Sequence, residues 1–194
     1  MTSLVLDPRT TALVLIDLQK GIVHQPLAPR SGPAVVANCA RLADCLRGLG
    51  GLVVPVHVAF SADRADALAP PADASLHRPG AAPAPDYAEF VPEMAPKPGD
   101  VVITKHQWGA FYGTELDLQL RRRAIGTIVL AGIATNFGVE STARNAYELG
   151  YAQVFVEDAM TSRSAEGHAF CCQTILPLLG RVRSTEQVLA ALGG

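Results

Sequence analysis

Two charged side chains follow short apolar runs directly, Asp17 after "ALVLI" and Lys105 after "VVIT". A carboxylate at the end of a buried strand is only partly hydrated, so its pKa can be tuned for proton transfer. A lysine in a similar position can neutralise that carboxylate or hold the carboxylate of a substrate. The two positions therefore indicate acid–base chemistry on a small anionic molecule. A turn-capping aspartate and a solvated lysine at a loop edge are the structural alternatives.

The segment "LAGIATNFG", from Leu130 to Gly138, leads from an apolar run into a helical pattern. Backbone N–H groups at such a helix start can bind a negatively charged oxygen. Gly132 and Gly138 permit unusual backbone angles or the close approach of a ligand. No G-K-[ST] follows, so the segment is not a P-loop, and an ordinary loop is the alternative. The residues of this segment expected to bind substrate are Ala134, Thr135, Asn136 and Phe137.

A second set of candidate binding residues flanks the two charged positions. Gln19 comes two residues after Asp17 in the segment Asp17-Leu18-Gln19, and the aromatic residues Trp108, Phe111 and Tyr112 come shortly after Lys105. Aromatic side chains here are expected to wall a pocket, with ordinary core packing as the alternative.

The elements that must position these residues alternate between strands and helices. Apolar or β-branched runs predict six strands: Ala12 to Ile16, Leu52 to Ala59, Val101 to Thr104, Thr127 to Ala131, Ala152 to Val156 and Arg181 to Arg183. Helical spacing and glycine stops predict helices at Pro33 to Leu49, Gly138 to Leu149 and Ser164 to Leu179, with Ser184 and Gln187 capping a last helix. Such alternation predicts an α/β fold, a parallel sheet with helices on both faces. Its site is expected beyond the carboxyl ends of the strands.

One long segment, Ser61 to Gly99, interrupts this alternation. It is rich in Pro, Ala and Asp and has no clear periodicity. Loops of this length inside a compact domain are usually functional or poorly ordered. We expect a lid or a subunit contact, with mobile packing as the alternative.

Length and composition limit the class of protein. The chain has 194 residues, a charged fraction of 18% and a net charge of −2, which predicts one domain over residues 1–194 and no nucleic-acid or membrane surface. No apolar run is long enough to span a bilayer, and no basic, apolar leader is evident at the N-terminus. The four cysteines, Cys39, Cys45, Cys171 and Cys172, have no C-x-x-C spacing. We expect reduced thiols in a cytoplasmic protein.

Taken together, the motifs resemble those of the isochorismatase-like (cysteine hydrolase) superfamily. They are Asp17 in "ALVLIDLQKGI", Lys105 in "VVITKHQWGAFYGTEL", and the segments "LAGIATNFGVESTARNAYELGY" and "VEDAMTSRSAEGH". The resemblance covers nearly the whole chain. It implies a three-layer α/β/α fold with a six-stranded parallel sheet in the order 3-2-1-4-5-6. It also implies that Asp17, Lys105 and the 133–138 loop converge, and that a cis peptide bond precedes Ala134.

The chain departs from that resemblance at the third catalytic position. The resemblance implies catalytic positions at Asp17, Lys105 and Gly138, and amidase members carry a nucleophilic cysteine where this chain has Gly138. Isochorismatase itself also lacks the cysteine and hydrolyses a vinyl ether, with the aspartate transferring the proton and water as the nucleophile. True isochorismatases have a different tripeptide in place of Ala134-Thr135-Asn136. The mechanism of isochorismatase can therefore apply to this chain even though the substrate differs.

No metal and no cofactor are expected. Nicotinamidases of the superfamily hold a metal with an Asp and histidines after the second strand, whereas His57 and His77 of this chain have no compact Asp/His cluster around them. A catalytic role for Cys171 or Cys172 is not favoured, because buried cysteines behave mostly as small apolar groups. The histidines that remain as candidates for the pocket rim are His24, His106 and His168.

Two classes of function remain open from the sequence. One is a cysteine-independent hydrolase, with an amidase that uses water in place of the thiol as a variant of it. The other is a binding protein that kept the pocket and lost the chemistry. The retained pair of Asp17 and Lys105 favours the enzyme, because a charged pair near an apolar pocket carries a desolvation cost. A homo-oligomer, most simply a two-fold dimer, is expected in either case.

Overall fold

Six parallel strands form one sheet in the order β3-β2-β1-β4-β5-β6. The computed structural model describes residues 4–74 and 83–193. The strands are β1 (Thr11–Ile16), β2 (Leu52–Val58), β3 (Ile103–Lys105), β4 (Thr127–Ile133), β5 (Ala152–Thr161) and β6 (Arg181–Arg183). The predicted sheet and its order are confirmed. The order changes direction between β1 and β4, and in such sheets the crevice at that point holds the ligand.

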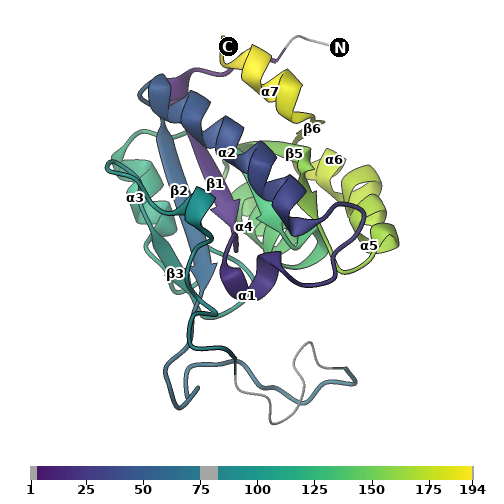
Figure 1. Cartoon of the computed structure of the whole chain (residues 1–194). Helices are drawn as coiled ribbons and strands as arrows, with labels where there is room; N and C mark the ends of the chain where they lie inside the picture. Colours follow the sequence, from purple (N-terminus) through teal and green to yellow (C-terminus); the bar gives the residue numbers. More distant parts are fainter. Residues whose placement is uncertain (1–3, 75–82, 194) are drawn as a thin grey trace.

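Helices cover both faces of the sheet (Figure 1). Alternate residues of β1 face opposite sides, so Leu13 and Leu15 join one core cluster while Val14 and Ile16 join the other. The first cluster includes α2 (Gly32–Gly48) and α7 (Thr185–Ala191), and the second includes α3 (Leu116–Arg122), α4 (Glu140–Glu148) and α6 (Leu176–Leu179). The remaining helices are short: α1 (Lys20–Val23), α5 (Ala165–Phe170) and 3₁₀ turns at Pro8–Thr10 and Pro92–Met94. None of the helices within the described ranges is both long and apolar enough to cross a bilayer.

Two predicted helices are less regular than their sequence patterns indicate. The helix predicted from Ser164 to Leu179 consists of α5, a π-helical turn over Cys171–Ile175, and α6. Pro177 stands in the first turn of α6 and has no N–H to donate to the preceding turn, which explains why a continuous α-helix is not kept. The helix predicted from Gly138 instead follows a π-helical turn over Thr135–Val139, so Gly138 lies inside the turn that enters α4.

Strand β5 is also longer than predicted, and its pairing with β4 is irregular. Leu130 pairs with Phe155, but Gly132 pairs with Met160. Four residues of β5, Val156 to Ala159, therefore lie opposite a single residue of β4. A bulge of this kind redirects side chains that a regular strand would point elsewhere. Asp158, for example, accepts hydrogen bonds from the backbone N and the Oγ1 of Thr185 at the start of α7, at 2.7 and 2.8 Å.

The long segment from Ser61 to Gly99, predicted as a lid or subunit contact, is held against the rest of the domain by residues of its second half. The side chain of Lys20 forms ion pairs with Asp86 and Glu89, at 3.3 and 2.6 Å, and Gln19 forms a β-bridge with Phe90. Figure 1 shows that the described parts of this segment extend beyond the carboxyl ends of β2 and β3. They therefore stand over the edge of the sheet where the site was predicted.

Candidate active site

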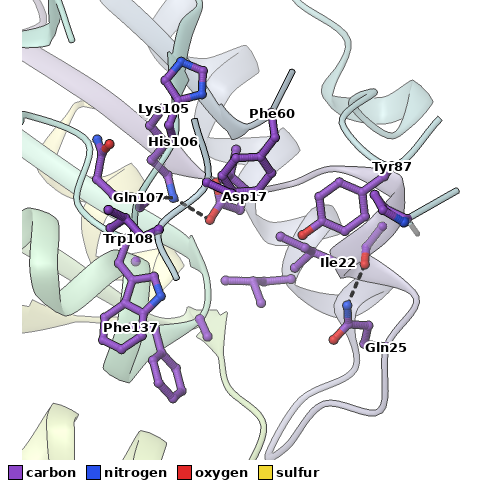
Figure 2. Close-up of a pocket in the computed structure, with 18 of the residues that line it drawn as sticks. Asp17, Ile22, Gln25, Phe60, Tyr87, Lys105, His106, Gln107, Trp108 and Phe137 are labelled. Atoms are coloured by element: carbon purple, nitrogen blue, oxygen red, sulfur yellow. Dashed lines mark hydrogen bonds and ion pairs between the residues drawn. The ribbon is translucent and has the colours of Figure 1, made fainter. Parts of the chain in front are cut away.

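Asp17 and Lys105 meet at the carboxyl edge of the sheet. Asp17 follows β1, and Lys105 is the last residue of β3 rather than the residue after it; β2 lies between the two strands. The Nζ of Lys105 lies 2.8 Å from Oδ2 of Asp17 and also donates to the backbone O of Gln107 at 3.1 Å. Both residues are buried, with 6% of Asp17 and 1% of Lys105 exposed. Figure 2 shows the ion pair at the wall of a cavity.

The backbone bends sharply where Asp17 leaves β1. Asp17 has φ +55°, in the left-handed region that aspartate tolerates better than most residues, and its N–H donates to the backbone O of Val56 at 2.8 Å. Gly132, which pairs with Ile16 on the neighbouring strand, has φ +115°. A Cβ at residue 132 would lie 2.2 Å from the backbone O of Ile16, so this close approach of β4 to β1 requires glycine.

Burial raises the pKa of the Asp17 carboxyl, and this effect outweighs the Lys105 ammonium and the more distant His57, which both lower the pKa. Oδ2 is occupied by Lys105, while Oδ1 is buried and has no hydrogen-bond partner among the described residues. An unpaired buried carboxylate oxygen is costly unless a ligand or a proton satisfies it. Asp17 is therefore suited to hold a proton or to bind a polar group in the cavity.

The loop between β4 and α4 lies next to Asp17. The peptide bond between Ile133 and Ala134 is cis, as the resemblance implies. The N–H groups of Phe137 and Val139 both donate to the backbone O of Ala134, at 3.1 Å, so these two amides are used within the loop. Gly138 is buried, and a Cβ built there would lie 3.4 Å from Oδ2 of Asp17 and 2.9 Å from Cγ2 of Ile16. A side chain at residue 138 would therefore point at the carboxyl group.

A cavity of about 980 Å³ opens above the ion pair. Of the predicted catalytic and substrate-binding residues, the ones that line it are Asp17, Lys105, Trp108, Ala134, Phe137 and Gly138. The rings of Trp108 and Phe137 meet edge to face, with their centroids 5.1 Å apart, and form one wall. The structure thus brings together the charged pair, the glycine and part of each predicted binding segment.

Three other predicted binding residues do not line the cavity: two are buried elsewhere and one is exposed. Gln19 is fully buried; its amide nitrogen donates to the backbone O of Val58 and Tyr87, and its Oε1 accepts from the N–H of Val58. Phe111 packs in the core against the ring of Tyr151. Tyr112 is 81% exposed and lies outside the cavity.

Thr135 and Asn136 also point away from the cavity, toward the structure behind the loop. The hydroxyl of Thr135 donates to the backbone O of Thr161 at 3.1 Å and contacts Nδ1 of His168 at 2.8 Å. The side chain of Asn136 accepts a hydrogen bond from the hydroxyl of Ser162. Both side chains support the loop and do not line the cavity, so the predicted substrate contacts of these two residues stay a prediction.

Several lining residues were missed by sequence reasoning. Arg64 and Tyr87 come from the long segment, and Arg163 comes from the turn after β5. Arg163 lies within the quoted motif "VEDAMTSRSAEGH", so the motif marked its segment but not its side chain. The other missed residues that line the cavity include Gly21, Ile22, Gln25, Pro26, Leu27, Val58 and Phe60.

The histidines do not form a metal site in the cavity, as far as the described residues show. His106 lines it, with Nδ1 2.6 Å from the backbone O of Ala59 and 3.3 Å from a carboxylate oxygen of Asp66. His57 contacts the backbone O of Ala88 and the hydroxyl of Thr104 through its two ring nitrogens. His77 lies outside the described residues. His24 is exposed and His168 is buried behind the loop, and neither lines the cavity.

Comparison with known proteins agrees with this geometry. The model of the isochorismatase domain matches residues 11–187. The chain is 52% identical to the isochorismatase family protein YwoC of Bacillus subtilis, over 97% of each chain. It is 34% identical to the ureidoacrylate amidohydrolase RutB of Variovorax paradoxus, over 80% of this chain and 70% of that protein. The solved structure of an isochorismatase family protein from Burkholderia thailandensis superposes with a TM-score of 0.92 at 48% identity, covering 100% of both chains. The chain therefore belongs to the isochorismatase family, and it is a hydrolase.

Proposed function

We propose that this chain is a cysteine-independent hydrolase of a small anionic substrate, in which Asp17 transfers the proton and water is the nucleophile. The observation that carries the proposal is the Asp17 carboxyl group. It is buried, held by Lys105 through one oxygen at 2.8 Å, and unpaired at the other oxygen among the described residues, at the wall of a cavity of about 980 Å³. A carboxyl in this state can exchange a proton with a reacting atom.

Asp17 and Lys105 divide the work in this proposal. Because burial raises the pKa of Asp17, the carboxyl can hold a proton despite the neighbouring ammonium, and it can donate that proton to the leaving oxygen or nitrogen. Lys105 orients Asp17 through the 2.8 Å contact and stabilises the carboxylate that remains after proton transfer. The same carboxylate can then receive a proton from the attacking water.

We assign this chain to a subgroup that lacks the nucleophilic cysteine, because residue 138 is glycine. A glycine cannot form a thioester, so the acyl group of a substrate cannot be transferred to residue 138. The missing side chain also leaves the space beside Oδ2 of Asp17 open toward the cavity. We assign this space to the attacking water, with backbone amides of the loop at Ala134 and Gly138 orienting the reacting oxygen.

The charges around the cavity favour an anionic substrate. Its described lining contains one carboxylate, Asp17, against three basic side chains, Arg64, Lys105 and Arg163. Arg64 lies over the ring of Phe60, 4.8 Å from its centroid. The lining therefore carries more basic than acidic side chains, which favours a substrate with a carboxylate.

The scissile bond is either a vinyl ether C–O bond or a C–N bond. Isochorismatase chemistry supplies the first possibility, and the relative named ureidoacrylate amidohydrolase supplies the second. Both reactions need a proton on the leaving atom and an activated water. Asp17 can supply the proton and activate the water in both reactions. The Asp17–Lys105 pair therefore does not distinguish a C–O substrate from a C–N substrate.

The second candidate function is a small-molecule binding protein that has kept the pocket without the chemistry. The observation that favours it is Gly138, because the glycine removes the nucleophile that amidase members use. In that case the cavity would bind a ligand and Asp17 would transfer no proton.

One screen separates the two functions. Purified protein is incubated with vinyl ethers, amides and esters, each as a carboxylate and as its neutral analogue, beside an Asp17→Ala control. Turnover of an anionic member, abolished by Asp17→Ala, is expected. Arg163→Gln should raise KM for that substrate, whereas Arg144→Gln, which breaks an ion pair with Glu140 outside the cavity, should not. No turnover, with equal ligand binding by the wild type and Asp17→Ala, would establish the binding protein instead.

A further inference from the structure

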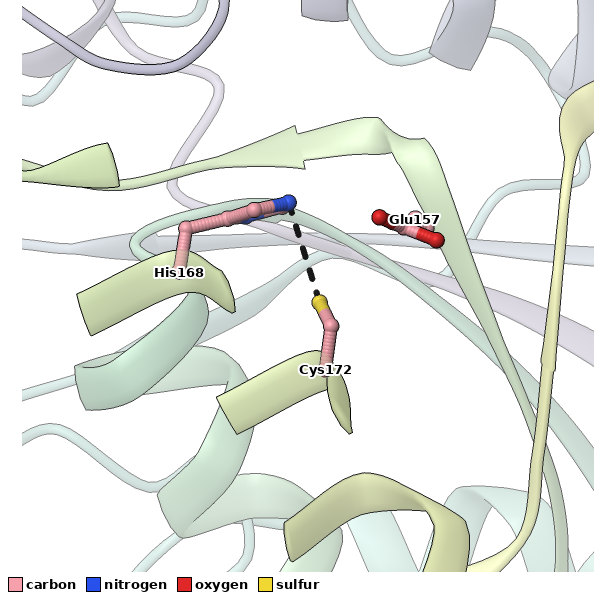
Figure 3. Close-up of side chains that lie close together, drawn as sticks. All are labelled: Glu157, His168 and Cys172. Carbon is pink, nitrogen blue, oxygen red and sulfur yellow. Dashed lines mark hydrogen bonds between the residues drawn. The ribbon is translucent and has the colours of Figure 1, made fainter. Parts of the chain in front are cut away.

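Three side chains with metal-binding atoms lie close together behind the active-site loop. They are Glu157, His168 and Cys172, and Figure 3 shows them pointing toward one another. One ligand atom from each residue lies within 4.8 Å of the others. Nε2 of His168 is 3.7 Å from Sγ of Cys172. Both of these residues are buried, with 2% and 4% of their surfaces exposed, while Glu157 reaches solvent.

The backbone explains why these three residues meet. His168 in α5 and Cys172 in the following π-helical turn are four residues apart, a spacing that puts both side chains on one face of a helix. Glu157 belongs to the four residues of β5 that lie in the irregular stretch opposite β4. The bulge changes the direction of the Glu157 side chain, which points to the helix face that carries His168 and Cys172.

Two contacts place a lone pair on Nε2 of His168. The hydroxyl of Thr135 donates to the backbone O of Thr161, so it accepts a hydrogen bond from Nδ1–H of His168 at 2.8 Å. On the other side of the ring, the guanidinium of Arg30 lies 3.5 Å from Nε2 and has only donors to offer. Nε2 is therefore the unprotonated nitrogen, and Nδ1 is tied to an acceptor in the way that metal-binding histidines usually are.

We propose that Glu157, His168 and Cys172 form a binding site for a borderline divalent cation such as Zn²⁺, with water as the fourth ligand. Sulfur, imidazole nitrogen and carboxylate oxygen together are the donors that zinc takes in proteins. Zinc bonds of about 2.0 Å to nitrogen and about 2.3 Å to sulfur place those atoms about 3.5 Å apart in a tetrahedral site. The observed 3.7 Å between Nε2 and Sγ is close to this spacing.

The charges of such a site balance. The Cys172 thiol loses its proton to solvent when the ion binds, so one thiolate and one carboxylate neutralise the two positive charges of the ion. The ion takes the lone pair of Nε2, so Arg30 gives up its contact with that nitrogen, keeps its hydrogen bond to the backbone O of Glu157 at 3.3 Å and faces a neutral site. The exposed Glu157 side chain has the freedom to complete the geometry.

The site is separate from the cavity but connected to its loop. Thr135, which accepts the hydrogen bond from His168, lies in the turn that carries Phe137 and Gly138. A bound ion would hold His168, and through Thr135 the back of that turn, in one position. The sequence-based expectation of no metal relied on local spacing, and this cluster comes from separate segments of the chain.

The test uses the full chain, stripped with a chelator and titrated with Co²⁺ and then Zn²⁺. One equivalent of Co²⁺ should give a thiolate-to-cobalt charge-transfer band, and Zn²⁺ should displace it and raise the Tm. Cys172→Ser and Glu157→Gln should each weaken binding at least tenfold. Cys171→Ser is the matched control, because the neighbouring Cys171 is equally buried but its Sγ donates to Glu140 instead, at 3.3 Å.

Three results would overturn the site. They are the absence of saturable Co²⁺ binding, a cobalt spectrum without a thiolate band, and equal loss of binding in Cys171→Ser and Cys172→Ser. Each variant is first checked for its metal-free Tm and circular dichroism. If Cys172→Ser fails to fold, Glu157→Gln decides the question, because its exposed side chain can change without disturbing the core.

Discussion

The Nζ of Lys105 lies 2.8 Å from Oδ2 of Asp17, although the two residues are 88 positions apart in the chain and β2 separates their strands. The contact joins the carboxyl ends of β1 and β3 with a charge-assisted hydrogen bond in a buried setting. Oδ1 of Asp17 is buried without a hydrogen-bond partner among the described residues, and Oδ2 is the oxygen that the open position at Gly138 faces. The ion pair therefore holds the carboxyl group at the cavity wall, with Oδ2 toward the open space at residue 138.

Asp17→Asn should remove proton transfer and leave the fold intact. The two side chains have nearly the same shape, and general acid–base groups typically contribute about 10²–10⁴-fold to the rate. We expect kcat on a confirmed substrate to fall by at least that factor, with an unchanged circular dichroism spectrum. Full activity in Asp17→Asn would mean that another group moves the proton.

Lys105→Met should separate positioning from substrate binding. Methionine keeps much of the apolar stem but leaves the Asp17 carboxyl without its cation, so the pKa of Asp17 should rise further. If Lys105 mainly sets the state of Asp17, kcat falls and the pH profile moves to higher pH. A loss confined to KM would instead show that Lys105 binds the anionic substrate. Steady-state kinetics across pH distinguishes the two outcomes.

The raised pKa of Asp17 predicts a pH dependence of stability. At pH values above the ordinary value of 3.8, the folded state retains a proton that the unfolded chain has released. The free energy of unfolding of the wild type should therefore fall as pH rises through this window, relative to Asp17→Asn. Denaturant titrations at several pH values measure this difference.

Asp44→Asn is a control of opposite sign for that experiment. Lys97 and Arg47 lower the pKa of Asp44, which is a surface carboxylate on α2. The wild type should gain stability relative to Asp44→Asn as pH rises from below 3.8. The same sign in both comparisons would contradict the assigned environment of Asp17.

Gly138→Cys should create a reactive thiol. Its Cβ would lie 3.4 Å from Oδ2 of Asp17, at the cavity, and Lys105 and the helix start favour the thiolate. Cys171 and Cys172 are buried, and burial raises the pKa of both. We expect faster alkylation of the introduced thiol than of those two residues, measured by peptide mass spectrometry.

Gly138→Ala is the control for Gly138→Cys. It tests whether a side chain fits at this position without introducing a thiol. The new Cβ would stand 2.9 Å from Cγ2 of Ile16, so Ile16 must move slightly in both variants. Similar melting temperatures for the two variants would assign any change in reactivity to the thiol. Alkylation of the introduced thiol no faster than that of Cys171 would mean that the loop has a different arrangement.

A homodimer is predicted for the chain in solution. Trp108 and Tyr112 are large aromatic residues with 55% and 81% of their surfaces exposed next to the cavity loop, and such side chains are typical of interfaces. Light scattering at micromolar concentration should report about twice 20.4 kDa. A single species of 20.4 kDa would contradict the prediction.

The sequence by itself determined the sheet and the edge that carries the site. Continuous apolar runs such as Leu13 to Ile16 predict buried parallel strands, and the carboxyl ends of parallel strands meet at one edge. Asp17 and Lys105 could be placed at the same edge for this reason, because each ends or follows a strand, and the family resemblance implied that they converge there. The cap at Ser184 could also be predicted, since its partner Gln187 is only three residues away.

Only the tertiary structure decided where the other side chains point. A loop sequence does not encode which side of the loop each residue faces, so Thr135 turned toward His168 while Phe137 turned toward the cavity. Arg163 and Glu157 take their positions from the packing of β5, whose bulge depends on its pairing with β4. These positions depend on contacts between residues far apart in the chain, and local periodicity carries no information about such contacts.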